Sequence, residues 1–134
     1  MSQTSDRIAT KRVYDMPAPE DGERILIDRL WPRGLSKERA RVDLWLKDVA
    51  PSAELRTWFG HDPARFDEFR QRYEAELARE PGRAAFALLR EHAERGRVTL
   101  VFGAQDATHS NAAVLRELLA RPPAPTPDGS SKQT

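Results

Sequence analysis

Hydrophobic residues along the chain form short continuous runs and longer stripes at helical spacing. The runs at residues 8–14, 24–31 and 98–102 are rich in β-branched and apolar side chains, which is typical of strands. The run at 24–31 is nearly continuous, which indicates a strand covered on both faces. Too few residues separate the first two runs for a helical crossover. These two strands therefore form either a hairpin or a pair that no βαβ unit joins directly.

The remaining hydrophobic residues recur every three or four positions and predict helices. Boundaries of these stripes coincide with capping residues: Ser52 precedes one short stripe, and Asp62-Pro63 opens a longer one. Five helices are predicted in this way, over residues 38–49, 53–60, 63–80, 83–95 and 110–119.

The order of these elements predicts one small, compact α/β domain over residues 7–120. We expect a short mixed or parallel sheet of about three strands, packed by about five helices. Residues 1–6 are polar, and residues 121–134 hold four prolines among small polar residues. Both segments are expected to be disordered and to take no part in a site.

The charge balance argues against partners that bind through bulk charge. Lys and Arg number 22 against 21 Asp and Glu, a formal net charge of +1, and there is no cysteine. Membrane and nucleic-acid partners are therefore not expected, and disulfides and zinc-cysteine sites are excluded. No apolar stretch is long enough to span a bilayer, and residues 1–10 lack the hydrophobic middle of a secretory signal, so we expect a soluble cytoplasmic protein.

One stretch of the chain departs from this balance. Between residues 29 and 41 a single acidic residue, Glu38, lies among five basic ones, which are Arg29, Arg33, Lys37, Arg39 and Arg41. Such a stretch is typical either of an anion-binding surface or of a solvated helix start. The sequence leaves both interpretations open.

The segment that leaves the second strand carries the first candidate site. Asp28 and Arg29 interrupt an apolar run, and a buried carboxylate and guanidinium are costly unless they are paired or used. They are either structural partners or part of a site in which Arg29 and Arg33 bind an anion while Asp28 positions it or acts as a base. The aromatic residues, Phe59 and Phe69 among them, either wall a pocket or belong to the core, and helical spacing is more typical of the core. Trp31 is the aromatic residue best placed to line a cleft.

The loop at 103–111 carries the second candidate site, because it joins the best predicted strand to the last helix. It offers Asp106, His109 and Asn111 around a helix N-terminus, although ordinary capping explains such residues equally well. His109 and His61 would form an acid/base pair if the fold brings them together. No metal site is expected from residues spaced so widely, and no cofactor is expected because neither GxGxxG nor GxxxxGK[ST] occurs.

Several strings in the chain resemble the YeaO-like proteins of domain-of-unknown-function family 488. The resemblance runs in order over about residues 7–119 and rests on KRVYD at 11–15, IDRLWPRG at 27–34, PSxELR at 51–56, FxxxYxxEL at 69–77, TLVF at 99–102 and NxA at 111–113. It implies a compact α/β domain and no established activity. Among the matching positions it adds Arg12, Ser52, Arg56 and Asn111 as candidate ligand-binding residues.

These observations lead to two hypotheses and a weaker third. In the first, an Arg- and Trp-lined cleft at the strand ends binds a small anionic ligand and acts as a hydrolase or transferase, with Asp28, His61 and His109 as catalytic groups. In the second, the domain is a non-catalytic binding or regulatory module, including one that contacts nucleic-acid phosphates. The third, a stress-related scaffold, has no positive support. The sequence decides neither enzymatic activity nor oligomeric state.

Overall fold

The fold is an α/β domain built on a parallel sheet, as the sequence predicts. The structure is a computed structural model that describes residues 7–121, so the expected disorder at 1–6 and 122–134 lies outside the described residues. Four strands make up the sheet, one more than expected, in the order β1-β4-β2-β3 with all pairs parallel. They are β1 (Ile8–Arg12), β2 (Glu23–Leu26), β3 (Leu44–Trp45) and β4 (Val98–Phe102).

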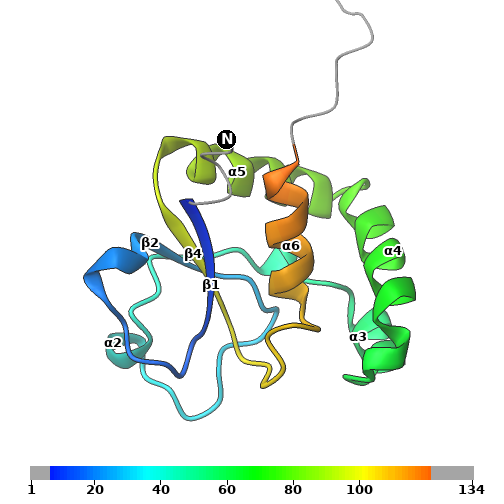
Figure 1. Cartoon of the computed structure of the whole chain (residues 1–134), viewed down its shortest axis with the longest axis horizontal. Helices are drawn as coiled ribbons and strands as arrows, with labels where there is room; N and C mark the ends of the chain where they lie inside the picture. Colours follow the sequence, from blue (N-terminus) through cyan, green and yellow to red (C-terminus); the bar gives the residue numbers. More distant parts are fainter. Residues whose placement is uncertain (1–6, 122–134) are drawn as a thin grey trace, which may run out of the picture.

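Strand β4 is the centre of the sheet and lies between β1 and β2 (Figure 1). Its five residues are all buried, which agrees with the continuous apolar run in the sequence. Because β4 separates them, β1 and β2 form no hairpin, and the short connection between them carries only the 3-10 helix η1 (Pro19–Asp21). The alternative of two strands that no βαβ unit joins is therefore the correct one.

The two faces of the sheet are covered by different parts of the chain. Alternate residues of β4, Val98, Leu100 and Phe102, belong to the larger core, to which the later helices contribute. Val101 belongs to a smaller core on the other face, together with Ala40 and packed against Trp31 and Trp45. The later helices are α3 (Ala53–Phe59), α4 (Phe66–Leu77), α5 (Gly82–Arg95) and α6 (Asn111–Ala120).

The helix predicted over residues 38–49 is wrong. This segment forms α2 (Lys37–Ala40), strand β3 and the 3-10 helix η2 (Lys47–Val49). The buried guanidinium of Arg24 donates to the carbonyls of Ala40 and Arg41, and Arg41 has a left-handed φ of 53°, which ends the helix. After Arg41 the chain forms strand β3, which pairs with β2. Tertiary contacts therefore override the helical spacing of the apolar residues.

The strand predicted over residues 24–31 is also shorter than expected. Strand β2 ends at Leu26, although Ile27 still donates its N–H to the carbonyl of Val101 at 3.2 Å. Beyond it, Leu30 is 67% exposed, which shows that the chain has left the sheet. Residues 28–33 thus form a loop at the carboxyl end of β2.

The boundaries of the later helices follow their capping residues. The side chain of Ser52 accepts from Leu55 N at the start of α3, and Gly60 closes that helix with a φ of 56°. Asp62 caps the 3-10 helix η3 (Pro63–Arg65), which leads directly into α4. These helices bring residues 50–61 to the same edge of the sheet as the loops that follow β2 and β4.

Candidate functional site

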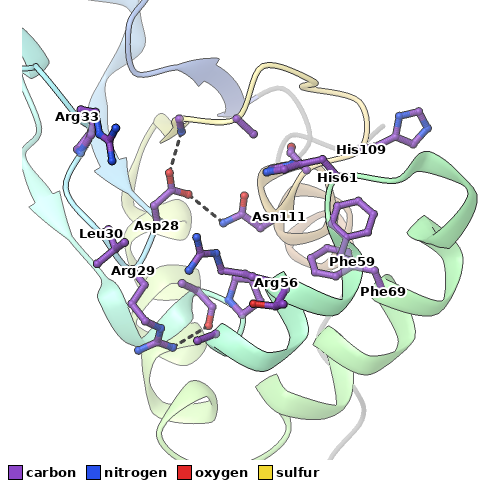
Figure 2. A pocket seen from close by; sticks show the side chains of 18 of the residues that line it. Asp28, Arg29, Leu30, Arg33, Arg56, Phe59, His61, Phe69, His109 and Asn111 are labelled. Atoms are coloured by element: carbon purple, nitrogen blue, oxygen red, sulfur yellow. Dashed lines mark hydrogen bonds between the residues drawn. The ribbon is translucent and has the colours of Figure 1, made fainter.

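A cleft of about 480 Å³ opens at the carboxyl ends of β2 and β4. Three segments distant in sequence form most of its walls: residues 28–33 after β2, residues 50–61 around α3, and residues 103–111 between β4 and α6 (Figure 2). Tyr14 and Phe69 complete the lining. Eight of the ten predicted site residues line it: Asp28, Arg29, Trp31, Arg33, Arg56, His61, His109 and Asn111. The fold therefore brings both polar segments of the sequence together on one concave surface.

Asp28 links the strand-end loops across the cleft. Its Oδ2 accepts from Gly103 N at 2.8 Å, and its Oδ1 accepts from Asn111 Nδ2 at 3.2 Å. The same Nδ2 donates to the carbonyl of Ile27 at 3.2 Å. Burial raises the pKa of Asp28, although the hydrogen bonds from Gly103 and Asn111 and the nearby charge of Arg56 oppose that rise.

The three arginines of the cleft are in different situations. The Nη2 of Arg29 donates to the carbonyl of Ala50 at 3.3 Å, and Figure 2 shows this side chain pointing away from Asp28. The Nε of Arg29 is buried without a hydrogen-bond partner in the described structure. Arg33 and Arg56 are exposed, and neither guanidinium has a hydrogen bond or ion pair within residues 7–121. Arg33 and Arg56 are therefore the cations most available to a ligand.

Ser52, a predicted ligand-binding residue, does not line the cleft, although both its neighbours do. Its Oγ donates to Glu76 Oε2 at 2.6 Å, and its backbone N–H donates to Glu76 Oε1 at 2.9 Å. One turn earlier on α4, the hydroxyl of buried Tyr73 donates to the carbonyl of Val49. These contacts hold the η2–α3 corner against α4, and so fix the position of Arg56.

Arg12, the other predicted residue outside the lining, holds the loop that follows β4. Its Nε donates to the carbonyl of Ala104 at 3.0 Å, and its Nη2 donates to the carbonyl of Gly103 at 3.4 Å. The guanidinium also lies 5.2 Å from the ring centroid of Tyr14. Arg12 therefore supports the cleft through the backbone of Gly103 and Ala104 and through the ring of Tyr14, which all line it.

The histidines lie on the cleft with different surroundings. His109 Nδ1 lies 2.8 Å from Asp106 Oδ2, and the His109 ring meets Phe66 edge-on at 5.1 Å. Hydrogen bonds from the side chain and backbone of His109 lower the pKa of Asp106. His61 has a left-handed φ of 58° and lies 6.1 Å from the ring of Phe59. Both histidines line the cleft, and no contact joins one to the other in the described structure.

The basic stretch at 29–41 is divided by the fold. Arg29 and Arg33 line the cleft, whereas Lys37, Arg39 and Arg41 are exposed outside it. Part of the stretch thus belongs to the candidate site, while Arg39 and Arg41 line a second pocket together with Glu38.

Two aromatic rings, for which the sequence left a core position and a pocket wall as alternatives, form one wall of the cleft. Phe59 and Phe69 stack at 4.3 Å and both line it. Their helical spacing favours the core over a pocket wall, and the two rings belong to both.

A metal site and a membrane-spanning helix each make requirements that the described residues do not meet. Within residues 7–121 no three side chains that bind metals are grouped closely enough to hold an ion. Over the same residues, none of the helices has the length and apolar character that crossing a membrane requires.

Comparison of the sequence with known proteins places the chain in a family. The chain belongs to domain-of-unknown-function family 488: residues 7–132 match the sequence model described as "Inactive DUF488-N3 subclade". It is a YeaO-like member, being 40% identical over 112 residues to the uncharacterized protein YeaO of Escherichia coli K12, across 84% of this chain and 96% of that protein. Uncharacterized proteins of Mycobacterium tuberculosis and Mycobacterium bovis are 49% identical over 113 residues, which cover 84% of this chain and 93% of theirs. No solved structure matches the chain.

Proposed function

We propose that this protein binds a small anionic molecule in the cleft at the strand ends and leaves it chemically unchanged. The observation that carries the proposal is the pair Arg33 and Arg56, two exposed guanidinium groups without partners in the described structure, on the lining of one cleft. Guanidinium groups bind phosphates and carboxylates in bidentate fashion. A volume of about 480 Å³ suits a small molecule.

The charges around the cleft support an anionic ligand. Three guanidinium groups line it, from Arg29, Arg33 and Arg56, against the single carboxylate of Asp28. The local field therefore attracts anions although the whole chain is nearly neutral.

Binding without turnover is favoured over a hydrolase or transferase by the family comparison. The subclade whose sequence model matches is described as inactive. Asp28, the predicted base, also has both carboxylate oxygens bonded to neighbouring groups of the protein. Asp28, His61 and His109 would then contact or position the ligand rather than transfer protons.

Thermal denaturation with a panel of phosphates and carboxylates tests the proposal. A ligand at 100 times its Kd should add about 2.7 kcal/mol to the free energy of unfolding. Arg33→Ala and Arg56→Ala should each reduce that gain, while Arg79→Ala, which changes an exposed arginine that lines neither this cleft nor the second pocket, should leave it unchanged. Mass spectrometry should recover the ligand intact after prolonged incubation.

Two results would contradict the proposal in different ways. If no anion of the panel stabilises the wild-type protein, or if all three variants respond alike, the cleft is not an anion site. If a stabilising anion is hydrolysed or transferred, and Asp28→Asn stops that reaction, the site is catalytic instead.

A further inference from the structure

We propose that the anion is a phosphorylated or carboxylated polyol, whose hydroxyl groups donate hydrogen bonds to the Asp28 carboxylate and to Asn111 Oδ1 in the cleft. This inference rests on the proposed function and adds the class of ligand. Its basis is a pair of fixed hydrogen-bond acceptors beside the exposed arginines, an arrangement that a simple anion would leave unused.

Asp28 and Asn111 both have acceptor positions to which no group of the described chain donates. Both hydrogens of the Asn111 amide nitrogen have partners, Ile27 O and Asp28 Oδ1, each at 3.2 Å. That arrangement leaves Asn111 Oδ1 with no donor in the described part of the chain. Each carboxylate oxygen of Asp28 accepts one hydrogen bond, whereas a carboxylate offers about four acceptor positions. Both side chains line the cleft and lie beside one another (Figure 2).

The orientation of these acceptors is fixed by the fold rather than by a ligand. Asp28 is tied to Gly103 N at the end of β4, and Asn111 is tied to the backbone at the end of β2. Asn111 is also the first residue of α6, directly after the capping residue Ser110. A ligand would therefore meet two acceptors already held in place, which reduces the entropy cost of binding.

The two acceptors, Asp28 and Asn111 Oδ1, determine which groups the ligand should carry besides its anionic group. A bare phosphate or carboxylate would be repelled by Asp28 and would leave both acceptors unpaired, which lowers affinity in a desolvated site. An ammonium group would pair with Asp28, but three guanidinium groups already line the cleft and repel a further cation. Neutral hydroxyl groups satisfy both acceptors without either repulsion.

The aromatic wall offers little to a ligand that binds by ring stacking. Phe59 is 5% exposed and Phe69 only 2%, because the two rings are packed into the core. Ring faces so deeply buried leave almost no area for a flat heterocycle to cover. Tyr14, the exposed ring of the lining, has the guanidinium of Arg12 5.2 Å from its centroid, and Trp31 packs edge-on against Trp45. Because these contacts already occupy the two rings, hydrogen bonding to Asp28 and Asn111 should set the selectivity of the cleft.

Matched ligand pairs test the inference on the full-length protein by isothermal titration calorimetry. Glycerol 3-phosphate is compared with n-propyl phosphate, and glycerate is compared with propionate, so that each pair differs only in its hydroxyl groups. We expect the hydroxylated member of a pair to bind about tenfold more tightly or better, because hydrogen bonds to a charged acceptor are among the stronger ones.

A substitution at Asp28 identifies the acceptor that is responsible. In Asp28→Asn the preference for the hydroxylated member should fall to about threefold or less, while n-propyl phosphate binds at least as tightly as to the wild type. The control is Asp48→Asn, which removes the same charge from an exposed position outside the cleft and should keep the full preference.

Each outcome of these titrations supports or overturns the inference. Equal affinities within both pairs would overturn it and leave the anion site standing, whereas no binding of any of the four probes would overturn both proposals. An unchanged preference in a folded Asp28→Asn protein would also overturn the inference. Should that variant fail to fold, the wild-type comparison of the two pairs decides alone.

Discussion

At the scale of single residues, Asp28 connects the structure of the cleft to its chemistry. Its hydrogen bonds to Gly103 and Asn111 join the two strand-end loops, so the residue is structural in the sense that the sequence allowed. It also presents its carboxylate to the cleft, so the same residue belongs to the candidate site. The structural interpretation therefore does not exclude the proposed site role, because the side chain that joins the loops also lines the cleft.

Because the pKa of Asp28 is raised, the stability of the folded protein should depend on pH in a characteristic way. Burial makes the folded protein hold this proton more tightly than the unfolded chain, whose carboxyl has the ordinary value of 3.8. The contribution of Asp28 to stability is therefore full below that value and is lost as pH rises through the raised pKa. In urea denaturation, the stability of the wild type relative to Asp28→Asn should fall as pH rises from about 4, and then level off.

The difference in unfolding free energy between the wild type and Asp28→Asn isolates the effect of Asp28, because all other carboxyl groups titrate in both proteins. A difference that stays constant with pH, or that grows as pH rises, would show that burial does not raise this pKa in the folded protein.

At the scale of secondary-structure elements, the contact between α3 and α4 positions the cleft. Ser52 combines two tasks: its Oγ caps α3 by accepting from Leu55 N at 3.1 Å, and it donates to Glu76 on α4. The neighbouring contact from Tyr73 to Val49 holds the chain just before that cap. Arg56 lies one turn further along α3, so its place at the cleft depends on this junction.

Removing the hydroxyl of Ser52 should therefore affect both stability and binding. Ser52→Ala should lower the free energy of unfolding by about 1–2 kcal/mol, through loss of the cap and of the Glu76 contact. It should also weaken binding of an anion that Arg56 contacts. The matched control is Ser36→Ala, which removes the cap of the short exposed helix α2 and should cost less than about 1 kcal/mol, with no change in binding.

Chemical denaturation and ligand titration on the same samples measure both effects. Equal losses of stability in the two serine variants, with binding intact in both, would mean that Ser52 only caps its own helix.

Local signals explain which elements the sequence could predict. Helix α3 has its cap and its terminal glycine within a few residues, and β4 is a continuous apolar run. The prediction of a helix over residues 38–49 is wrong because the conformation there depends on Arg24 and on pairing with β2. The contact of Ser52 with Glu76 was hidden for the same reason, since 24 residues separate the two. By contrast, the rule that ligands collect at strand ends located Asp28 and His109 from the sequence.

At the scale of the whole molecule, β4 holds together the sheet and the cleft. It pairs with β1 on one side and β2 on the other, and its side chains enter both cores. The chain then continues directly to Gly103, whose N–H donates to Asp28. A protein that loses packing at β4 should therefore lose stability globally rather than at one edge.

Leu100 at the centre of β4 gives the sharpest test, because its side chain is completely buried. Leu100→Ala should lower the free energy of unfolding by about 2–5 kcal/mol, from lost transfer energy and from the cavity left behind. The same substitution at Leu30, which is 67% exposed, should change it by less than about 0.5 kcal/mol. Urea denaturation followed by tryptophan fluorescence and by far-UV circular dichroism should give coincident transitions in both variants, because one sheet connects the two cores. Transitions that separate in Leu100→Ala would show instead that the two faces of the sheet unfold independently and that β4 does not couple them.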